Sequence, residues 1–388
     1  MKKDFTILFS VNLVLRIIMQ GLLPIFPIFI SRFGVSKEHN GFIIAGAYLM
    51  LLFSTWLNGK LVPAFFNAKT LFCLSVFPLV AAIFLLGQAQ SILEMISVLT
   101  ILFFAAGFNI TSNGILIGYF SRSETAGKNY GIIGMSNLFG SIFGGFIVGP
   151  VLFSMGYDKG FILFAIAFAV TGLSSFGIAK PSIQKTNNPV TFKITKGFAS
   201  LLFASFLVTI LIHFFLFTSS LLLSKQGYSI KDISIFSAIG MGIAFPSPYI
   251  MGWLTKRYAP ISLILAIFLL TGIAVTILLL PISIPIYLIG IAFIGILSFS
   301  LRPVVMSLIF DWFDEKTLPM AQSYLGVGAW LAAIVGYLFT GMLLQRTGQT
   351  NTIIIGVVIL ITATIVLIFG VKKQVNAEQV EKPALDVH

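Results

Sequence analysis

Long runs of hydrophobic residues, separated by short polar connections, dominate the chain. A helix that crosses a bilayer takes about 20 apolar residues, and most of these runs reach that length. Charged residues, prolines and glycines mark the ends of the runs and predict twelve membrane-spanning helices. The predicted spans are 5–31, 40–58, 69–87, 92–119, 130–154, 160–179, 198–223, 233–254, 260–280, 285–310, 321–345 and 350–371.

The longest internal connection, 180–196, carries four lysines, two prolines and no acidic residue. It predicts a cytoplasmic linker between an N-terminal six-helix bundle, 1–179, and a C-terminal six-helix bundle, 197–371. The charged segment 372–388 is expected to be a cytoplasmic tail.

The two halves also repeat each other in sequence. At an offset of 192 the fifth span aligns with the eleventh, with Gly134, Gly144, Gly149 and Leu152 over Gly326, Gly336, Gly341 and Leu344. At 193, Gly59 and Leu61 align with Gly252 and Leu254. The repeat predicts an all-α polytopic membrane protein of two pseudo-symmetric six-helix bundles, with a substrate site between them near mid-bilayer.

Composition excludes soluble classes of protein. Hydrophobic residues make up 58% of the 388 residues and charged residues only 9%, whereas globular domains carry about a quarter charged residues. A cytosolic enzyme and a nucleic-acid binder are therefore excluded. The only cysteine, Cys73, lies in an apolar run, so we expect no disulfide.

The distribution of basic residues predicts the orientation. Lysines and arginines number 24 against 12 acidic residues, which gives a formal net charge of +12. Sixteen of them fall in one alternating set of connections and six in the other. Because cytoplasmic loops of membrane proteins are enriched in Lys and Arg, we expect a multi-pass protein of the cell membrane with both termini in the cytoplasm.

A polar stripe on the first span is the sharpest candidate for a substrate site. Asn12, Arg16 and Gln20 recur every fourth residue and so share one face of a helix. Arg16 follows Asp4 by about 18 Å of helix, near mid-bilayer, where a cation is costly unless it faces a partner or a wet cavity. We expect it to face the cavity; the alternative is a structural arginine bonded to backbone carbonyls.

Three other spans carry polar candidates. His213 is the intramembrane side chain whose ordinary pKa suits proton coupling, with a hydrogen-bonded structural histidine as the alternative. Arg302 precedes Pro303 and could contact substrate or satisfy a kink. Asn109 and Asn113 share a face and could line the cavity or bond neighbouring helices. These residues place the substrate site among the first, fourth, seventh and tenth spans.

Small residues suggest close packing between helices. Gly140, Gly144, Gly145 and Gly149 of the fifth span, together with Gly336, keep a small face that allows helices to approach and slide.

Several motifs resemble the major facilitator superfamily, and within it the twelve-helix drug:proton antiporters of the NorA type. Residues 140–149, GSIFGGFIVG, resemble the antiporter motif G-x-x-x-G-P-x-x-G-G of that group. The linker motif between helices 2 and 3 keeps Gly59 and Leu61. Its copy in the second half keeps Gly252, Leu254 and Arg257. Further matches to the group are residues 228–234, Arg302-Pro303, Pro24 and Pro27.

The resemblance implies the fold, a packing and gating role for these motif residues, and export driven by a proton gradient. The acidic residues that such exporters carry in helices 7 and 10 correspond to Phe215 and Phe299 here. The predicted cavity is therefore cation-lined, with no internal acid.

The leading hypothesis is a secondary transporter that exports small organic molecules, coupled to protons or another ion. Family resemblance favours multidrug efflux, whereas the charges favour an anionic or zwitterionic metabolite such as a metallophore. A non-transporting membrane receptor is the alternative from another class. We expect a monomer in the lipid bilayer that uses no cofactor, metal or nucleic acid, because no phosphate loop, ligand cluster or catalytic constellation occurs.

Overall fold

The computed structural model describes residues 2–64, 67–120, 123–179, 194–255, 257–280, 283–313 and 318–381. Helices account for nearly all of these residues, and no strand occurs among them. In chain order the helices are α1 Lys2–Leu22, α2 Phe26–Ser31, α3 Lys37–Ala64, α4 Ala68–Gln88, α5 Ile92–Phe120, α6 Ser123–Leu173, the 3-10 helix η1 Ser174–Gly177, α7 Lys196–Lys225, α8 Ile230–Ile243, α9 Ser247–Leu254, α10 Pro260–Ile277, α11 Ile284–Trp312, α12 Leu318–Arg346 and α13 Gly348–Glu381.

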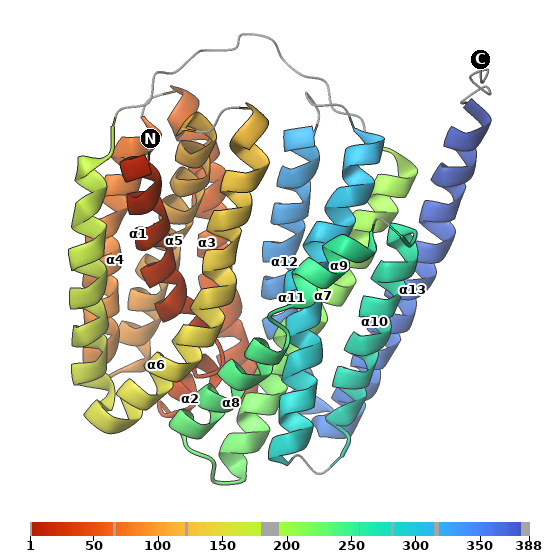
Figure 1. Ribbon diagram of the computed structural model, residues 1–388. Coiled ribbons are helices and arrows are strands. Elements are labelled where there is room, and N and C mark those ends of the chain that lie inside the picture. Colours follow the sequence, from red (N-terminus) through yellow and green to blue (C-terminus); the bar gives the residue numbers. More distant parts are fainter. Residues whose placement is uncertain are drawn as a thin grey trace.

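Eleven helical segments of the described chain are long and apolar enough to cross a bilayer. The longest, 135–177, contains the predicted spans 130–154 and 160–179, which the structure joins in α6 without an intervening loop. Gly156 (φ +80°) turns the chain there, and the two arms of α6 run toward the same end of the molecule (Figure 1). A backbone with this φ strains any L side chain, so glycine suits the turn. The arrangement thus has the predicted twelve crossings.

Prolines break two of the predicted spans. The first span is not one helix, because a turn at 23–25, which contains Pro24, separates α1 from α2. The eighth span likewise breaks into α8 and α9 at a turn, 244–246, that ends with Pro246. Proline lacks the N–H that a continuous helix needs and restricts the residue before it, so these breaks have a local cause.

The chain forms two groups of helices. Helices α1 to α6 pack on one another, as do α7 to α13, and across the two groups α3 packs on α12, α6 on α8 and α2 on α7. The start of α1 and the end of α13 lie at one end of the bundle, opposite α2 and the start of α8 (Figure 1). We call these the inner end and the outer end, following the predicted cytoplasmic position of the termini. Residues 180–193 of the predicted linker lie outside the described residues.

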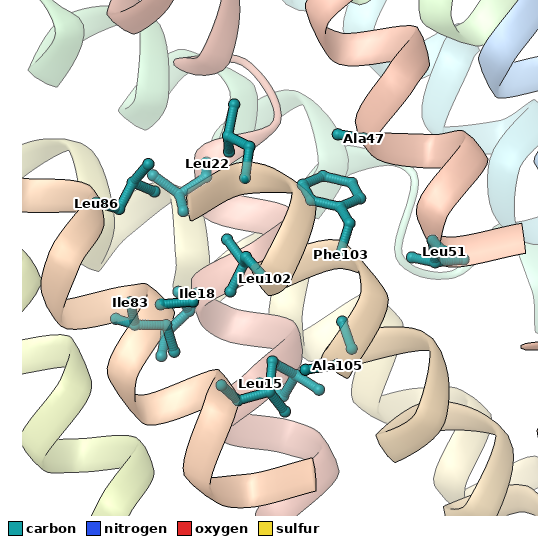
Figure 2. Close-up of a cluster of buried hydrophobic side chains, with 14 of the residues drawn as sticks. Leu15, Ile18, Leu22, Ala47, Leu51, Ile83, Leu86, Leu102, Phe103 and Ala105 are labelled. Carbon is teal, nitrogen blue, oxygen red and sulfur yellow. The ribbon is translucent and has the colours of Figure 1, made fainter. Parts of the chain in front are cut away.

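A large apolar core fills the first group of helices. Figure 2 shows side chains of α1, α3, α4 and α5 meeting there, among them Leu15, Ala47, Ile83 and Leu102. The same core takes in buried side chains from α7 and α12, so it continues across the boundary between the two groups. In lipid, such close packing is a main force that holds helices together.

The closest approaches between the two groups follow the sequence repeat. A Cβ on Gly149 of α6 would meet the Ser234 side chain at 2.2 Å and the Ile230 carbonyl at 2.9 Å in α8. A Cβ on Gly341 of α12 would meet the Lys37 carbonyl at 2.6 Å and Gly41 at 3.0 Å in α3. Gly149 and Gly341 are equivalent at the offset of 192. Their partners are equivalent at 193, so both contacts have the same geometry.

Candidate functional site

Arg16 lies in the middle of α1, where that helix packs on α6. Its backbone lies against Gly140, because a Cβ on this glycine would come within 2.7 Å of the Arg16 Cβ. The side chain is partly buried, and its Nε atom has no hydrogen-bond partner among the described residues. A buried donor without a partner is costly, so a ligand or water in this place would stabilise it.

The second intramembrane cation, Arg302 of α11, lies across from Arg16. The two side chains are close enough for their charges to repel each other. Arg302 is exposed, whereas the Arg16 Nε is buried. The two arginines thus lie near each other, one from each group of helices.

Described acidic side chains lie at helix ends or turns, away from the two arginines. Glu94 is exposed in the first turn of α5, where it accepts a hydrogen bond from the Gln90 N–H (2.9 Å). The other four whose side chains the structure describes are Asp4, Glu38, Asp158 and Asp232, whereas the side chains of Glu124, Asp311, Glu378 and Glu381 lie outside its described part. The charge of the two arginines is thus not offset by any carboxylate whose side chain is described.

Five rings form a continuous layer between the two groups of helices, which we call the aromatic layer. Tyr48 of α3 lies at its centre, and its ring centroid is 5.2 Å from Phe103, 5.6 Å from His213, 5.5 Å from Tyr337 and 6.2 Å from Trp330. His213 of α7 also lies 4.9 Å from Tyr337 of α12. Figure 2 shows Phe103 of α5 pointing toward α3.

The aromatic layer lies on the outer side of the arginines. Counted along each helix from its inner end, Arg302 and Arg16 lie about 15 and 21 Å deep. Tyr48, His213 and Tyr337 lie about 24, 26 and 28 Å deep on the same measure. Tyr48 is close enough to Arg16 for the two to interact electrostatically, so the layer and the arginine pair adjoin.

Contacts near the outer end close the region beyond this layer. In addition to the glycine contacts, the Ser234 hydroxyl donates to the Gly145 carbonyl (2.8 Å), and Arg346 of α12 pairs with Glu38 of α3 (2.6 Å). Toward the inner end, a Cβ on Gly326 of α12 would meet no described atom within 4 Å. Among the described residues, these contacts close the region beyond the layer toward the outer end, and α12 leaves room at Gly326 toward the inner end.

Three predicted cavity residues make hydrogen bonds within the first group of helices instead. Asn12 donates to the Ser136 hydroxyl of α6 (2.5 Å), Asn109 donates to Ser75 of α4 (3.0 Å), and Asn113 donates to the Leu8 carbonyl of α1 (3.0 Å). All three asparagines are buried. Their geometry favours the packing alternative over a cavity role. Gln20 is partly buried one turn beyond Arg16.

His213 lies where the two groups of helices meet. Its ring lies between Tyr48 and Tyr337, and its Nδ1 atom is buried without a hydrogen-bond partner in the described chain. It is therefore part of the contact between the two groups of helices, next to the arginines but in the aromatic layer.

The predicted packing glycines lie where helices touch. Gly144 approaches Ile17 and Gly21 of α1, Gly145 approaches Ser234 and Ala238 of α8, and Gly336 approaches His213 and Ile210 of α7, each within about 3 Å of an added Cβ. Leu61 and Leu254 pack against the cores of their groups, and Arg257 lies 4.2 Å from the Trp253 ring centroid. The surroundings of Gly59 and Gly252 lie outside the described part of the structure.

Tyr48, Tyr337 and Trp330 were not among the predicted site residues. They belong to α3 and α12, so the centre draws on two more spans than the four that were expected. No spacing in the sequence separates these rings from the other aromatic residues, which include 40 phenylalanines. Only the packing of helices distant in sequence identifies them.

Two grooves lie elsewhere in the first group of helices. One of about 360 Å³ is lined by apolar side chains of α3, α4 and α5, including Pro78 and Phe104. The other, of about 190 Å³, lies beside Lys69, whose ammonium group donates to the Phe176 carbonyl of η1. Neither groove is lined by a predicted substrate residue.

The comparisons with solved structures agree on the fold. A bacterial homologue of the human lysosomal transporter Spinster, in an inward-facing and unoccupied conformation, is 11% identical, with 95% of this chain and 96% of that chain covered and a TM-score of 0.74. A POT family transporter in complex with 5-aminolevulinic acid is 12% identical, with 97% and 96% covered and a TM-score of 0.76. The nucleoside transporter NupG is 14% identical, with 95% and 99% covered and a TM-score of 0.75.

No curated protein matches the sequence. The family model of the Major Facilitator Superfamily matches residues 8–298 and 247–386, which together span nearly the whole chain. With the helical bundle described above, this match shows that the chain belongs to the Major Facilitator Superfamily and is a multi-pass membrane transporter rather than an enzyme.

Proposed function

We propose that this transporter exports small organic anions or zwitterions across the cell membrane, with both termini in the cytoplasm. The observation that carries the proposal is the pair of neighbouring arginines, Arg16 and Arg302, with no described carboxylate between them. A guanidinium group presents a rigid fork of donors that suits carboxylate oxygens. A carboxylate-rich metallophore would be one substrate of this class.

The same charges argue against a hydrophobic cation as the main substrate. A cation in a low-dielectric site needs an opposite charge nearby, and multidrug exporters of the NorA type use acids for this purpose. The corresponding positions here are Phe215, which is fully buried, and Phe299. We therefore place the protein near such exporters in overall design and export direction, but with a different substrate charge.

Alternating access fits the distribution of contacts. The two groups of helices meet through repeat-equivalent glycines near the outer end, and the face of α12 near Gly326 has space on the inner side. Rocking of two similar bundles around a central site would close the inner end and open the outer one. A substrate would then enter from the cytoplasm and leave outside.

A proton gradient is the proposed driving force, with His213 as the proton acceptor. The ordinary pKa of histidine lies near 6.5, and the buried Nδ1 atom has no partner in the described chain that would compete with a proton. The groups that face the ring are Tyr48 and Tyr337, with Arg16 as the next charge beyond Tyr48. Separation of the aromatic layer would expose His213 to the outer solution and let it exchange its proton there.

The test is flux of a carboxylate and of a hydrophobic cation by the full chain in proteoliposomes, for wild type, Arg16→Gln, Arg16→Lys and Arg302→Gln. Loss of a hydrogen bond between charged groups predicts about a 10- to 100-fold loss of carboxylate affinity in both glutamine variants. Arg16→Lys should keep more activity than Arg16→Gln. Lys225→Gln, which removes an exposed charge at the end of α7, is the matched control.

Unchanged carboxylate flux in both glutamine variants would exclude an anion site at these arginines. Flux of the cation alone would support multidrug efflux instead. Absence of substrate-dependent flux in any condition would support the receptor hypothesis.

A further inference from the structure

We propose that Trp330 is a specificity-determining residue, and that its indole stacks on a flat ring in the substrate. This inference rests on the proposed function, because it adds a second recognition element beside the arginine pair. The substrate class becomes a carboxylate that also carries an aromatic or heteroaromatic ring.

Trp330 belongs to the aromatic layer but reaches deepest toward the inner end. It lies about 18 Å from the inner end of α12, between the depths of Arg302 and Arg16 on that measure. Its ring centroid is 6.2 Å from that of Tyr48, which in turn interacts electrostatically with Arg16. The indole therefore lies at the level of the two arginines and is linked to them through Tyr48.

Trp330 also differs from the two tyrosines of the layer in its surroundings. Tyr48 and Tyr337 are only 5% and 1% exposed, so other rings already cover their faces. Trp330 packs against the core of the first group of helices and is only partly buried. Of these three rings, it is the one with surface left for a ligand.

There is space on the inner side of the indole. Gly326 precedes Trp330 by one helical turn and so lies on the same face of α12, which also carries Tyr337. A Cβ added at Gly326 would meet no described atom within 4 Å, whereas at Gly336 it would meet Ile210 and His213. The turn of α12 below Trp330 thus leaves room for a group that lies against the indole.

The chemistry of the site follows from these neighbours. An indole presents a large flat face that binds an aromatic ring in an offset-stacked or edge-to-face arrangement. The arginines would hold the carboxylate at the same depth. A flat ring near a carboxylate matches both elements, whereas an aliphatic acid of the same charge uses only the arginines.

The experiment compares 3-phenylpropionate with hexanoate, two acids of equal charge. Binding to the full chain in nanodiscs is followed by Trp330 fluorescence in a variant with Trp56→Phe, Trp253→Phe and Trp312→Phe, and by competition for flux. We expect 3-phenylpropionate to bind about two- to tenfold more tightly than hexanoate and to change the Trp330 emission.

Three variants test the role of the indole by competition for flux. Trp330→Leu should remove the advantage of 3-phenylpropionate and leave hexanoate unchanged, and Trp330→Phe should keep part of it. Gly326→Leu, which fills the space below the indole, should weaken 3-phenylpropionate more than hexanoate. Trp56→Leu, at a ring that is exposed on α3 away from the layer, is the matched control.

Different results would contradict the stacking role of Trp330 and the proposed transport of anions. Equal affinity for the two acids in wild type, or an equal loss for both in Trp330→Leu and in Gly326→Leu, would overturn the stacking role and leave the anion site intact. If neither acid binds, or if Arg16→Gln affects neither, the proposed function fails and this inference fails with it.

Discussion

The contact of α6 with α8 and that of α12 with α3 are copies of each other in backbone geometry but differ in chemistry. In both, a glycine touches the first turns of another helix: Gly149, late in the first arm of α6, in the first case, and Gly341, late in α12, in the second. The α6–α8 contact includes a hydrogen bond that the Ser234 hydroxyl donates to the Gly145 carbonyl. The α3–α12 contact adds an ion pair and the aromatic layer.

The sequence repeat explains how closely the two halves approach, but it does not explain the titratable chemistry between them. The shared glycines fix how closely the two halves approach, so the repeat accounts for the mechanics of the outer end. The titratable ring His213 meets only the α3–α12 side, through Tyr48 and Tyr337. Its repeat equivalent is Gln20 at the offset of 193 and Gly21 at 192, and neither of these titrates. Candidate coupling chemistry is therefore present on one side alone.

The largest expected effect comes from replacing the glycine of either contact with a larger residue. Gly149→Val and Gly341→Val would place side-chain atoms where an added Cβ already meets its neighbours at 2.2 and 2.6 Å. Overpacking of this kind costs about 1–3 kcal/mol, so we expect the closed outer state to become about 5- to 150-fold less populated, with a comparable loss of flux. Distances between spin labels at the outer ends, together with proteoliposome flux, measure both.

Gly46→Val is the control for these two valine variants, because a Cβ at Gly46 would meet no described atom within 4 Å. If only one of Gly149→Val and Gly341→Val lowers the flux, the two contacts are not mechanically equivalent.

An intermediate effect is expected from His213→Gln, which acts on one contact only. Wild-type export should rise when the outer solution is more acidic than the inner one, because protons then enter as substrate leaves. The variant should lose this response to the gradient but still exchange labelled for unlabelled substrate, since Arg16 is intact. His39→Gln changes an exposed histidine that contacts Ser36 and is the matched control. If export by His213→Gln still rises with the proton gradient, His213 is not part of the coupling mechanism.

The smallest effects should come from the two polar contacts near the outer end. Ser234→Ala removes a buried hydrogen bond, which predicts about a two- to tenfold shift away from the closed outer state. Glu38→Gln removes a partly solvated ion pair with Arg346, so we expect less than about a fivefold shift, and one that high salt abolishes. Both shifts are measured with the same spin-label distances. A larger effect of Glu38→Gln than of Ser234→Ala would reverse the ranking.

The fold was largely predictable because lipid imposes a simple rule. Every backbone group in a bilayer must be satisfied within a helix, so long apolar runs translate directly into spans. The interruptions near Pro24 and Pro246 split two of those spans, and only the structure shows where the helices restart. At Gly156 the absence of a loop could not be read from hydropathy, because the turn takes a single residue.

The site was less predictable because it depends on how each helix is rotated. Asn109 and Asn113 share a face of α5, as expected, but they bond to different neighbours, α4 and α1. The proximity of Arg16 and Arg302, and the ring contacts of Tyr48, exist only once helices distant in sequence are packed together. A sequence gives the face of a residue on its own helix but not the partner that the face meets.

The glycine contacts near the outer end also have a consequence for repeated turnover. Where Gly41 touches Gly341, backbone meets backbone, and no flexible side chain has to be ordered when the surfaces join. Fixing a long side chain costs up to about 2 kcal/mol of conformational entropy, and a glycine pair avoids that loss. Such a surface can part and rejoin in every cycle without finding a new set of rotamers.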